Sequence, residues 1–176
     1  MGGMIAQEVA INYPERVSSL TLVCTAPVVD PFLSYIVRSW ILLRPQCSLE
    51  DFFQIISPWI FTHRFYEQPE AVQAFMQMVR DNPFPQTVDC FRRQCEAVLT
   101  HDAQNRLAAI KSPTHVIVGE EDILTPPRYS RVLAQQIQRV RLTVLPGSGH
   151  GLFWEKPTEF NQAVLDFLKE QLAAVA

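Results

Sequence analysis

Glycine is scarce in this chain of 176 residues, which contains only 6 of them and none between residues 4 and 118. The six fall at three places in the sequence: Gly2 and Gly3, Gly119, and the group Gly147, Gly149 and Gly151. Glycine readily takes positive φ and lets the backbone approach other groups closely. We therefore expect tight turns or close approaches at these three places.

Several motifs and compositional extremes are also missing. No apolar run is long enough to cross a bilayer, and the N-terminus has no charged segment followed by an apolar one, so no signal peptide is expected. Position 6 is Ala, which does not fit a myristoylation motif after Met1-Gly2. The net charge of −3 disfavours a nucleic-acid surface. These absences predict a cytoplasmic globular protein with neither nucleic acid nor membrane as a partner.

The chain shows no signature of a metal or nucleotide cofactor. Its four cysteines form no C-x-x-C motif and are interpreted as reduced thiols: Cys24, Cys47, Cys90 and Cys95. Its four histidines are scattered, without H-E-x-x-H, and G-x-G-x-x-G is absent. The sequence therefore predicts no metal site and no cofactor.

What is present indicates an α/β protein. The apolar runs Val17–Cys24, 114–118 and 141–145 are bounded by Gly, Pro or polar residues, which is typical of buried strands. Helices are expected at 2–12, 127–137 and 157–174. The first of these helices is expected to pack closely on a sheet because it carries the small residues Gly2, Gly3, Ala6 and Ala10. Ile5 and Val9 are expected to fill the remaining space between this helix and the sheet. In the last, Phe160, Val164, Phe167, Leu168 and Leu172 are expected to share one face.

Residues 27–100 differ in character from the rest. They hold eight of the 11 phenylalanines and two of the three tryptophans. Their apolar residues recur at helical spacing, as in Ile36, Trp40 and Leu43. Prolines at 31, 45, 58, 69, 83 and 85 divide the segment into short helices. For any single aromatic residue here, a helical core without a ligand role is the simpler interpretation.

Two of the expected strands end in side chains suited to acid–base chemistry. One runs into Gly119-Glu120-Glu121-Asp122, and the other leads through Pro146 and Gly147 to His150, 28 residues after Asp122. In an open parallel sheet, the carboxyl ends of neighbouring strands meet at one edge. The sequence therefore predicts that Asp122 and His150 lie side by side.

This pattern resembles the α/β-hydrolase family, whose triad follows the chain order Ser, Asp or Glu, His. The resemblance implies Asp122 as the acid and His150 as the base of a serine hydrolase for esters or enol-lactones. The family's nucleophile lies in G-x-S-x-G, often followed by another Gly, whereas this chain opens Met1-Gly2-Gly3-Met4. The resemblance implies that the chain begins one residue after the serine, with the Met1 backbone N–H as one oxyanion donor. The second donor would lie in an upstream loop that this sequence lacks, so the chain as given is expected to be inactive alone.

The resemblance also implies an organisation. Residues 1–26 would be the helix and strand after the nucleophile, 27–100 a helical cap over the site, and 101–176 the carboxyl-terminal core. About three strands of the family's sheet would remain, in a fold of class α/β. The expected partner is a small ester or lactone with an apolar acyl part. The strand Val17–Cys24 would lack a neighbour on one side, which predicts instability or a homodimer through that edge.

Rival residues and functions remain. Glu120 and Glu121 compete with Asp122 as the acid, and the following Thr125-Pro126 favours Asp122. Ser148 has Gly on both sides but does not match G-x-S-x-G and is interpreted as a spacer. His63, His101 and His115 are interpreted as structural, His101-Asp102 resembling the family's pair at the return from the cap. The alternative functions are a C–C hydrolase or haloperoxidase-type relative, and a binding or dimerising fragment without catalysis.

Overall fold

The computed structural model describes residues 1–173 of the chain. Within them, three strands form a parallel sheet in the order β1-β2-β3, with the bounds β1 Leu20–Val23, β2 Thr114–Gly119 and β3 Val140–Leu145. In this register Leu22 lies opposite Val116, which lies opposite Leu142. The predicted α/β class and the short parallel sheet with flanking helices are confirmed.

Helices make up most of the remaining chain. The α-helices are α1 Gly2–Asn12, α2 Pro31–Leu43, α3 Leu49–Ile56, α4 His63–Tyr66, α5 Pro69–Arg80, α6 Val88–Leu99, α7 Pro127–Gln136, α8 Leu152–Glu155 and α9 Pro157–Ala173. Between them lie the short 3₁₀ helices η1 Pro14–Arg16, η2 Arg44–Gln46, η3 Ser57–Trp59 and η4 Gln104–Ala109. Residue 174, which we expected to end the last helix, lies outside the described residues, as do 175 and 176 of the carboxyl-terminal segment.

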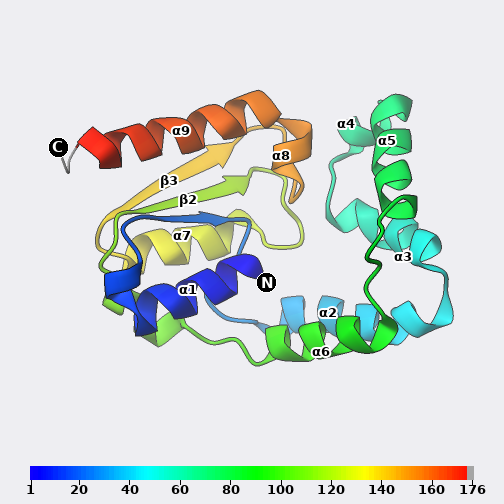
Figure 1. The fold of residues 1–176 in the computed structure, drawn as a ribbon, viewed down its shortest axis with the longest axis horizontal. Helices are drawn as coiled ribbons and strands as arrows, with labels where there is room; N and C mark the ends of the chain where they lie inside the picture. The colour runs from blue at the N-terminus through cyan, green and yellow to red at the C-terminus, as the bar shows by residue number, and fades with distance from the viewer. Residues whose placement is uncertain (174–176) are drawn as a thin grey trace.

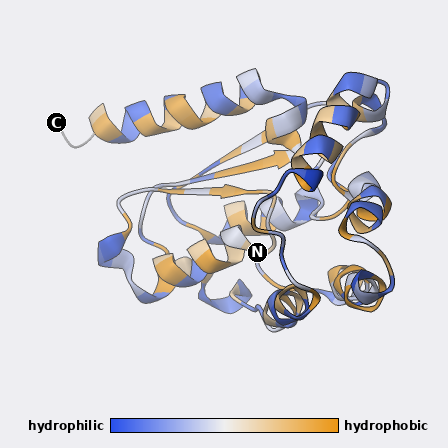
Figure 2. Cartoon of the chain, turned by 45° about the vertical axis from the view of Figure 1, so that its right-hand side comes forward, coloured by the Kyte–Doolittle hydropathy of each residue, from blue (hydrophilic) through white to orange (hydrophobic). Residues whose placement is uncertain are grey.

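The sheet lies between two helical layers (Figure 1). Helix α9 covers one face, and α1 and α7 cover the other. Every residue of β2 is buried, as expected for the central strand of a parallel sheet, and its apolar run is Val116 to Val118. Figure 2 shows hydrophobic and hydrophilic residues alternating along α9, as expected for a helix with one face on a sheet.

The helices α2 to α6 lie beyond the carboxyl ends of the strands (Figure 1). Prolines divide this segment as predicted: Pro31 and Pro69 begin α2 and α5, and Pro83 and Pro85 lie between α5 and α6. The side chain of Asp30 caps α2 by accepting the backbone N–H of Leu33. The segment therefore lies where it can cover the strand ends, and its role as a cap stays a prediction, as does the division at residues 26 and 100.

The structure corrects three details of the predicted elements. The first strand is shorter than expected, since it begins at Leu20 rather than Val17. Helix α1 buries Met4, Gln7 and Ala10, whereas Ile5 is 54% exposed and does not fill the sheet contact. Val9, on the same side of the helix as Ile5, is also exposed. The predicted apolar face of α9 is wrong near the end of the helix: Phe167 is buried, but Leu168 and Leu172 are exposed. These two side chains line an open hollow with Ser18, Pro113 and Arg139, at the amino ends of the strands.

Among residues 1–173, no helix combines the length and the apolar character needed to cross a bilayer.

Candidate active site

Asp122 is held in the turn that follows β2. Its Oδ1 accepts the backbone N–H groups of Leu124 at 2.9 Å and of Thr125 at 2.8 Å. Its Oδ2 accepts the Thr125 hydroxyl at 2.9 Å. The carboxylate is buried, so these donors replace the water that it would otherwise bind. The turn therefore fixes both carboxylate oxygens, leaving Oδ2 directed at its second partner.

That partner is His150, which lies in the loop between β3 and α8. Its Nδ1 lies 2.9 Å from Oδ2 of Asp122 and 3.1 Å from the hydroxyl of Thr125. Burial raises the pKa of the Asp122 carboxyl, but the hydrogen bonds from His150 and Thr125 outweigh it, so this pKa lies below its usual value. Asp122 is therefore ionised near neutral pH and holds the imidazole by Nδ1, which leaves Nε2 as the nitrogen for proton transfer.

Backbone contacts join the acid loop to the histidine loop. The N–H groups of Glu120 and Glu121 donate to the carbonyls of Leu145 and Ser148, each at 2.9 Å. A Cβ on Gly119 would overlap the carbonyl oxygens of Ser148 and Gly149. Gly119 thus permits the close approach that these hydrogen bonds require. The glycine pattern predicted a special backbone position here, and the structure supplies the reason.

Glu155 at the end of α8 ties the histidine loop to the helical segment 27–100. One carboxylate oxygen accepts the backbone N–H and the hydroxyl of Thr62 at 2.9 and 2.6 Å. The other accepts the backbone N–H of Gly149, next to His150, at 2.7 Å. We did not identify Glu155 or predict α8 from the sequence; its spacing of five residues after His150 carries no signal without knowledge of the turn.

A cavity of about 210 Å³ lies against His150. His150, Thr125 and Cys24 line it on the side of the strand ends, and Met1, directly before α1, lines it from another side. Its other walls are mainly apolar side chains of α2 and α6: Leu33, Val37, Trp40, Phe91, Cys95 and Val98. The structure thus brings Met1, whose N–H was the expected oxyanion donor, and His150 to one cavity.

The rival acids and the rival serine have other partners. Glu121 forms an ion pair with Arg64 at 2.6 Å, and Glu120 accepts the N–H of Gly147 at 3.2 Å. Ser148 is buried, and its hydroxyl donates to the carbonyl of Leu145 at 3.0 Å. Among these candidates, Asp122 is the carboxylate in contact with His150, and Ser148 serves the loop backbone.

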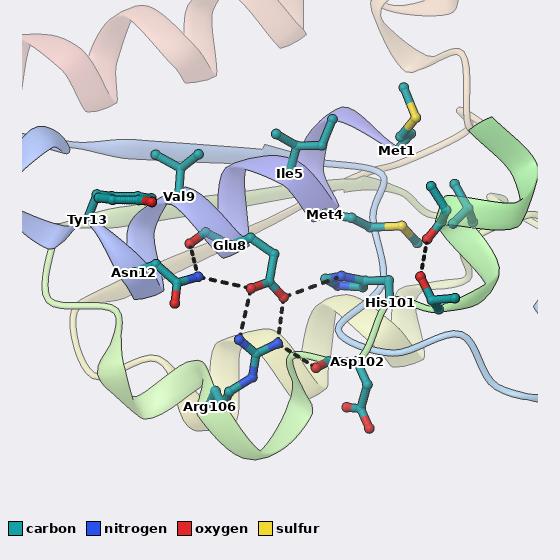
Figure 3. A pocket seen from close by; sticks show the side chains of 13 residues that line it. Met1, Met4, Ile5, Glu8, Val9, Asn12, Tyr13, His101, Asp102 and Arg106 are labelled. Atoms are coloured by element: carbon teal, nitrogen blue, oxygen red, sulfur yellow. Dashed lines mark hydrogen bonds and ion pairs between the residues drawn. The ribbon is translucent and has the colours of Figure 1, made fainter. Parts of the chain in front are cut away.

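The other three histidines make no hydrogen bond or ion pair with Asp122 or His150. His63 is exposed at 4.0 Å from Glu121. His101 lies under α1, where its Nδ1 is 3.8 Å from Glu8, and Glu8 also pairs with Arg106 (Figure 3). Burial lowers the pKa of His101. His115 of β2 is fully buried with Nε2 at 2.8 Å from the Thr143 hydroxyl. These positions agree with structural roles.

Buried His115 predicts a pH-dependent stability. Burial, with a further contribution from Arg141, lowers its pKa to about 4 in the folded chain, against 6.5 for an ordinary histidine. Because the unfolded chain binds the proton more tightly, the free energy of unfolding is expected to fall by about 3 kcal/mol from pH 6.5 to pH 4. His101 adds to this loss in the same direction. Urea unfolding across this range measures it, and His115→Asn should reduce the loss; equal stability at both ends would contradict the prediction.

Comparisons with known proteins agree with this architecture. Residues 1–157 match the family model for the alpha/beta hydrolase fold. The chain is 33% identical over 97% of its length to a protein described as the carbamate hydrolase RutD of Azorhizobium caulinodans, of which it covers 64%. It is 28% identical over 97% of its length to a 2-hydroxy-6-oxo-6-phenylhexa-2,4-dienoate hydrolase of Comamonas testosteroni, of which it covers 61%. The enol-lactonase of Burkholderia xenovorans LB400 superimposes with a TM-score of 0.84 at 25% identity, over 96% of this chain and 63% of that one.

The chain belongs to the α/β-hydrolase fold family. It spans slightly less than two thirds of the length of the relatives named above.

Proposed function

We propose that Asp122 and His150 are the acid and the base of a serine hydrolase that cleaves a carboxylic ester or an enol-lactone. The observation that carries the proposal is the Nδ1–Oδ2 contact of 2.9 Å, made at the carboxyl ends of β2 and β3 beside a cavity. The similarity to a carbamate hydrolase, a 2-hydroxy-6-oxo-6-phenylhexa-2,4-dienoate hydrolase and an enol-lactonase supports the reaction class.

In this mechanism, Nε2 of His150 takes the proton of a serine hydroxyl as the serine oxygen attacks the carbonyl carbon. Asp122 holds the imidazole in the required tautomer and stabilises the cation that forms. His150 then protonates the leaving oxygen, and water releases the acyl group by the same steps. The Met1 backbone N–H is proposed as one donor to the oxyanion.

The substrate class follows from the cavity. Its walls on α2 and α6 are mainly apolar, with Gln94 as the polar side chain from these two helices. A site of this kind favours an apolar or aromatic acyl group. Helices α2 to α6 would then act as the cap, and Glu155 would hold that cap against the histidine loop through Thr62 and Gly149.

The sequence contains no G-x-S-x-G motif, so we propose that this chain by itself has no esterase activity. Incubation with a fluorophosphonate probe tests this directly. We expect no labelled serine by mass spectrometry. Stoichiometric labelling of Ser148 or any other serine would overturn the assignment. A panel of aryl esters, enol-lactones and C–C hydrolase substrates, applied to a form that carries a serine ahead of Met1, tests the reaction class and the C–C and haloperoxidase-type alternatives.

A second candidate function, a dimerising fragment without catalysis, rests on the exposed side of β1. In residues 1–173, β1 pairs with β2 alone. The backbone N–H groups of Leu20 and Cys24 donate toward β2, so those of Thr21 and Val23 point to the free edge. Beside this edge, α1 presents an exposed apolar row along one side (Figure 3): Met1, Ile5, Val9 and Tyr13.

The chain as given is therefore expected to form a dimer through β1 or to aggregate. Light scattering after size-exclusion chromatography measures the mass. Thr21→Pro removes an N–H of the free edge and leaves the β1–β2 hydrogen bonds in place, so it should shift the protein toward the monomer, whereas Thr21→Ala should not. A monomeric wild-type chain with a sharp, reversible thermal transition would contradict this candidate.

A further inference from the structure

Cys24 lies at the strand ends beside Asp122 and His150 but has no part in the proposed hydrolysis. It follows β1 directly and has a φ of +44°, a left-handed backbone conformation that residues other than glycine rarely adopt. It is 9% exposed and lines the same cavity as His150. Its sulfur, a carboxylate oxygen of Asp122 and a ring nitrogen of His150 all lie within 4.8 Å of one another. Three strand ends thus deliver a thiol, a carboxylate and an imidazole to one point.

We propose that Cys24, Asp122 and His150 form a binding site for a borderline-soft divalent transition metal ion, with Zn²⁺ as the natural candidate. Sulfur, nitrogen and carboxylate oxygen are the ligand atoms that this ion takes in proteins. Metal–ligand distances of about 2.0 to 2.3 Å place tetrahedral ligand atoms about 3.3 to 3.6 Å apart. The present separations, all within 4.8 Å, therefore need to change by about 1.5 Å at most.

Charge balance favours the ion at this buried place. Binding releases one proton, from the Cys24 thiol. The thiolate and the Asp122 carboxylate then neutralise the two positive charges, so no net charge is buried. The imidazole stays neutral: Nδ1 binds the metal, and its proton is replaced by one on Nε2. Asp122 keeps the two backbone N–H donors on Oδ1 while Oδ2 turns to the metal.

Water can supply the fourth ligand of the metal ion. His150 and Cys24 both line the cavity of about 210 Å³, so water entering it would complete a tetrahedral site. The metal would occupy the Nδ1 that otherwise contacts Asp122 at 2.9 Å. The two states exclude each other, so a bound ion would disable the proposed acid–base pair. The site itself depends only on these three side chains and stands whether or not the chain belongs to a hydrolase that acts on esters.

Cobalt is the probe that tests the site, because a thiolate bound to Co²⁺ gives a charge-transfer absorption in the near ultraviolet. We expect titration of the reduced chain with Co²⁺ to produce this band with a stoichiometry of one ion per chain. One proton should be released per ion in weakly buffered solution, and Zn²⁺ should abolish the band by displacement.

Matched variants assign the ligands. Cys24→Ser should lose the band, and His150→Gln should weaken binding. Cys95→Ser should retain the charge-transfer band, although Cys95 lines the same cavity. A chain in which Cys47, Cys90 and Cys95 are all replaced by Ser should also retain it, and circular dichroism confirms that each variant is folded. Absence of the band at excess Co²⁺, or its persistence in folded Cys24→Ser, would overturn the proposal.

Discussion

Replacement of His150 by alanine is expected to lower kcat/KM for ester hydrolysis by about 10³-fold or more. The measurement requires a form of the protein that carries a serine ahead of Met1. The reason is the geometry at the strand ends: His150 is the base that Asp122 holds by Nδ1 at 2.9 Å. Without the imidazole, nothing at this position takes the proton of the attacking hydroxyl.

Asp122→Asn in the same form should lower kcat more than KM, because the amide can hold the imidazole in the wrong tautomer. The matched control is His63→Gln, which alters an exposed imidazole and should leave the rate within about twofold. Retention of activity within tenfold in His150→Ala would contradict the assigned role, whatever the substrate.

Gly119→Ala is expected to destabilise the chain by about 3 kcal/mol or more, or to prevent folding. The added Cβ would overlap backbone carbonyl oxygens of Ser148 and Gly149, and a backbone cannot move aside as the tip of a flexible side chain can. The loops of Asp122 and His150 would have to separate. Urea unfolding followed by circular dichroism measures the loss.

Gly2→Ala is the control for this effect, since a Cβ at Gly2 meets nothing within 4 Å. In helix α1, alanine should even stabilise by up to about 1 kcal/mol. If Gly119→Ala and Gly2→Ala have the same stability, the close approach of the two loops is not what the structure describes.

Much of this architecture could be predicted because it depends on local patterns. The short apolar run of β2, Val116 to Val118, ends at Gly119, and its length and its β-branched residues indicate a buried strand without knowledge of its neighbours. The proximity of Asp122 and His150 followed from one further rule, that parallel strands end at the same edge. The same rule led to the expected site before any contact was known.

Other features depend on packing between distant segments. The sequence did not reveal which side of α1 faces the core, because small and large apolar residues occur on both sides, and Ile5 is exposed. Glu155 contacts Thr62, 93 residues earlier. Cys24, interpreted as an ordinary reduced thiol, lies within 4.8 Å of both site residues. No spacing in the chain encodes such contacts.

The relatives named above are described as hydrolases of different substrates. A carbamate hydrolase, a 2-hydroxy-6-oxo-6-phenylhexa-2,4-dienoate hydrolase and an enol-lactonase match this part of the fold. The common element in our account is the pair of loops that follow β2 and β3. One fold can carry many different reactions, so the residues at the site rather than the fold decide the reaction.

The most direct test of the central claim is the tautomer of His150, measured by NMR on the chain labelled with ¹⁵N-histidine. The account predicts that Nδ1 carries the proton of the neutral imidazole, in a strong hydrogen bond that disappears in Asp122→Ala, while Nε2 is unprotonated. A proton on Nε2 with Nδ1 bare, unchanged by Asp122→Ala, would contradict the pairing of Asp122 with His150 and with it the proposed hydrolase chemistry.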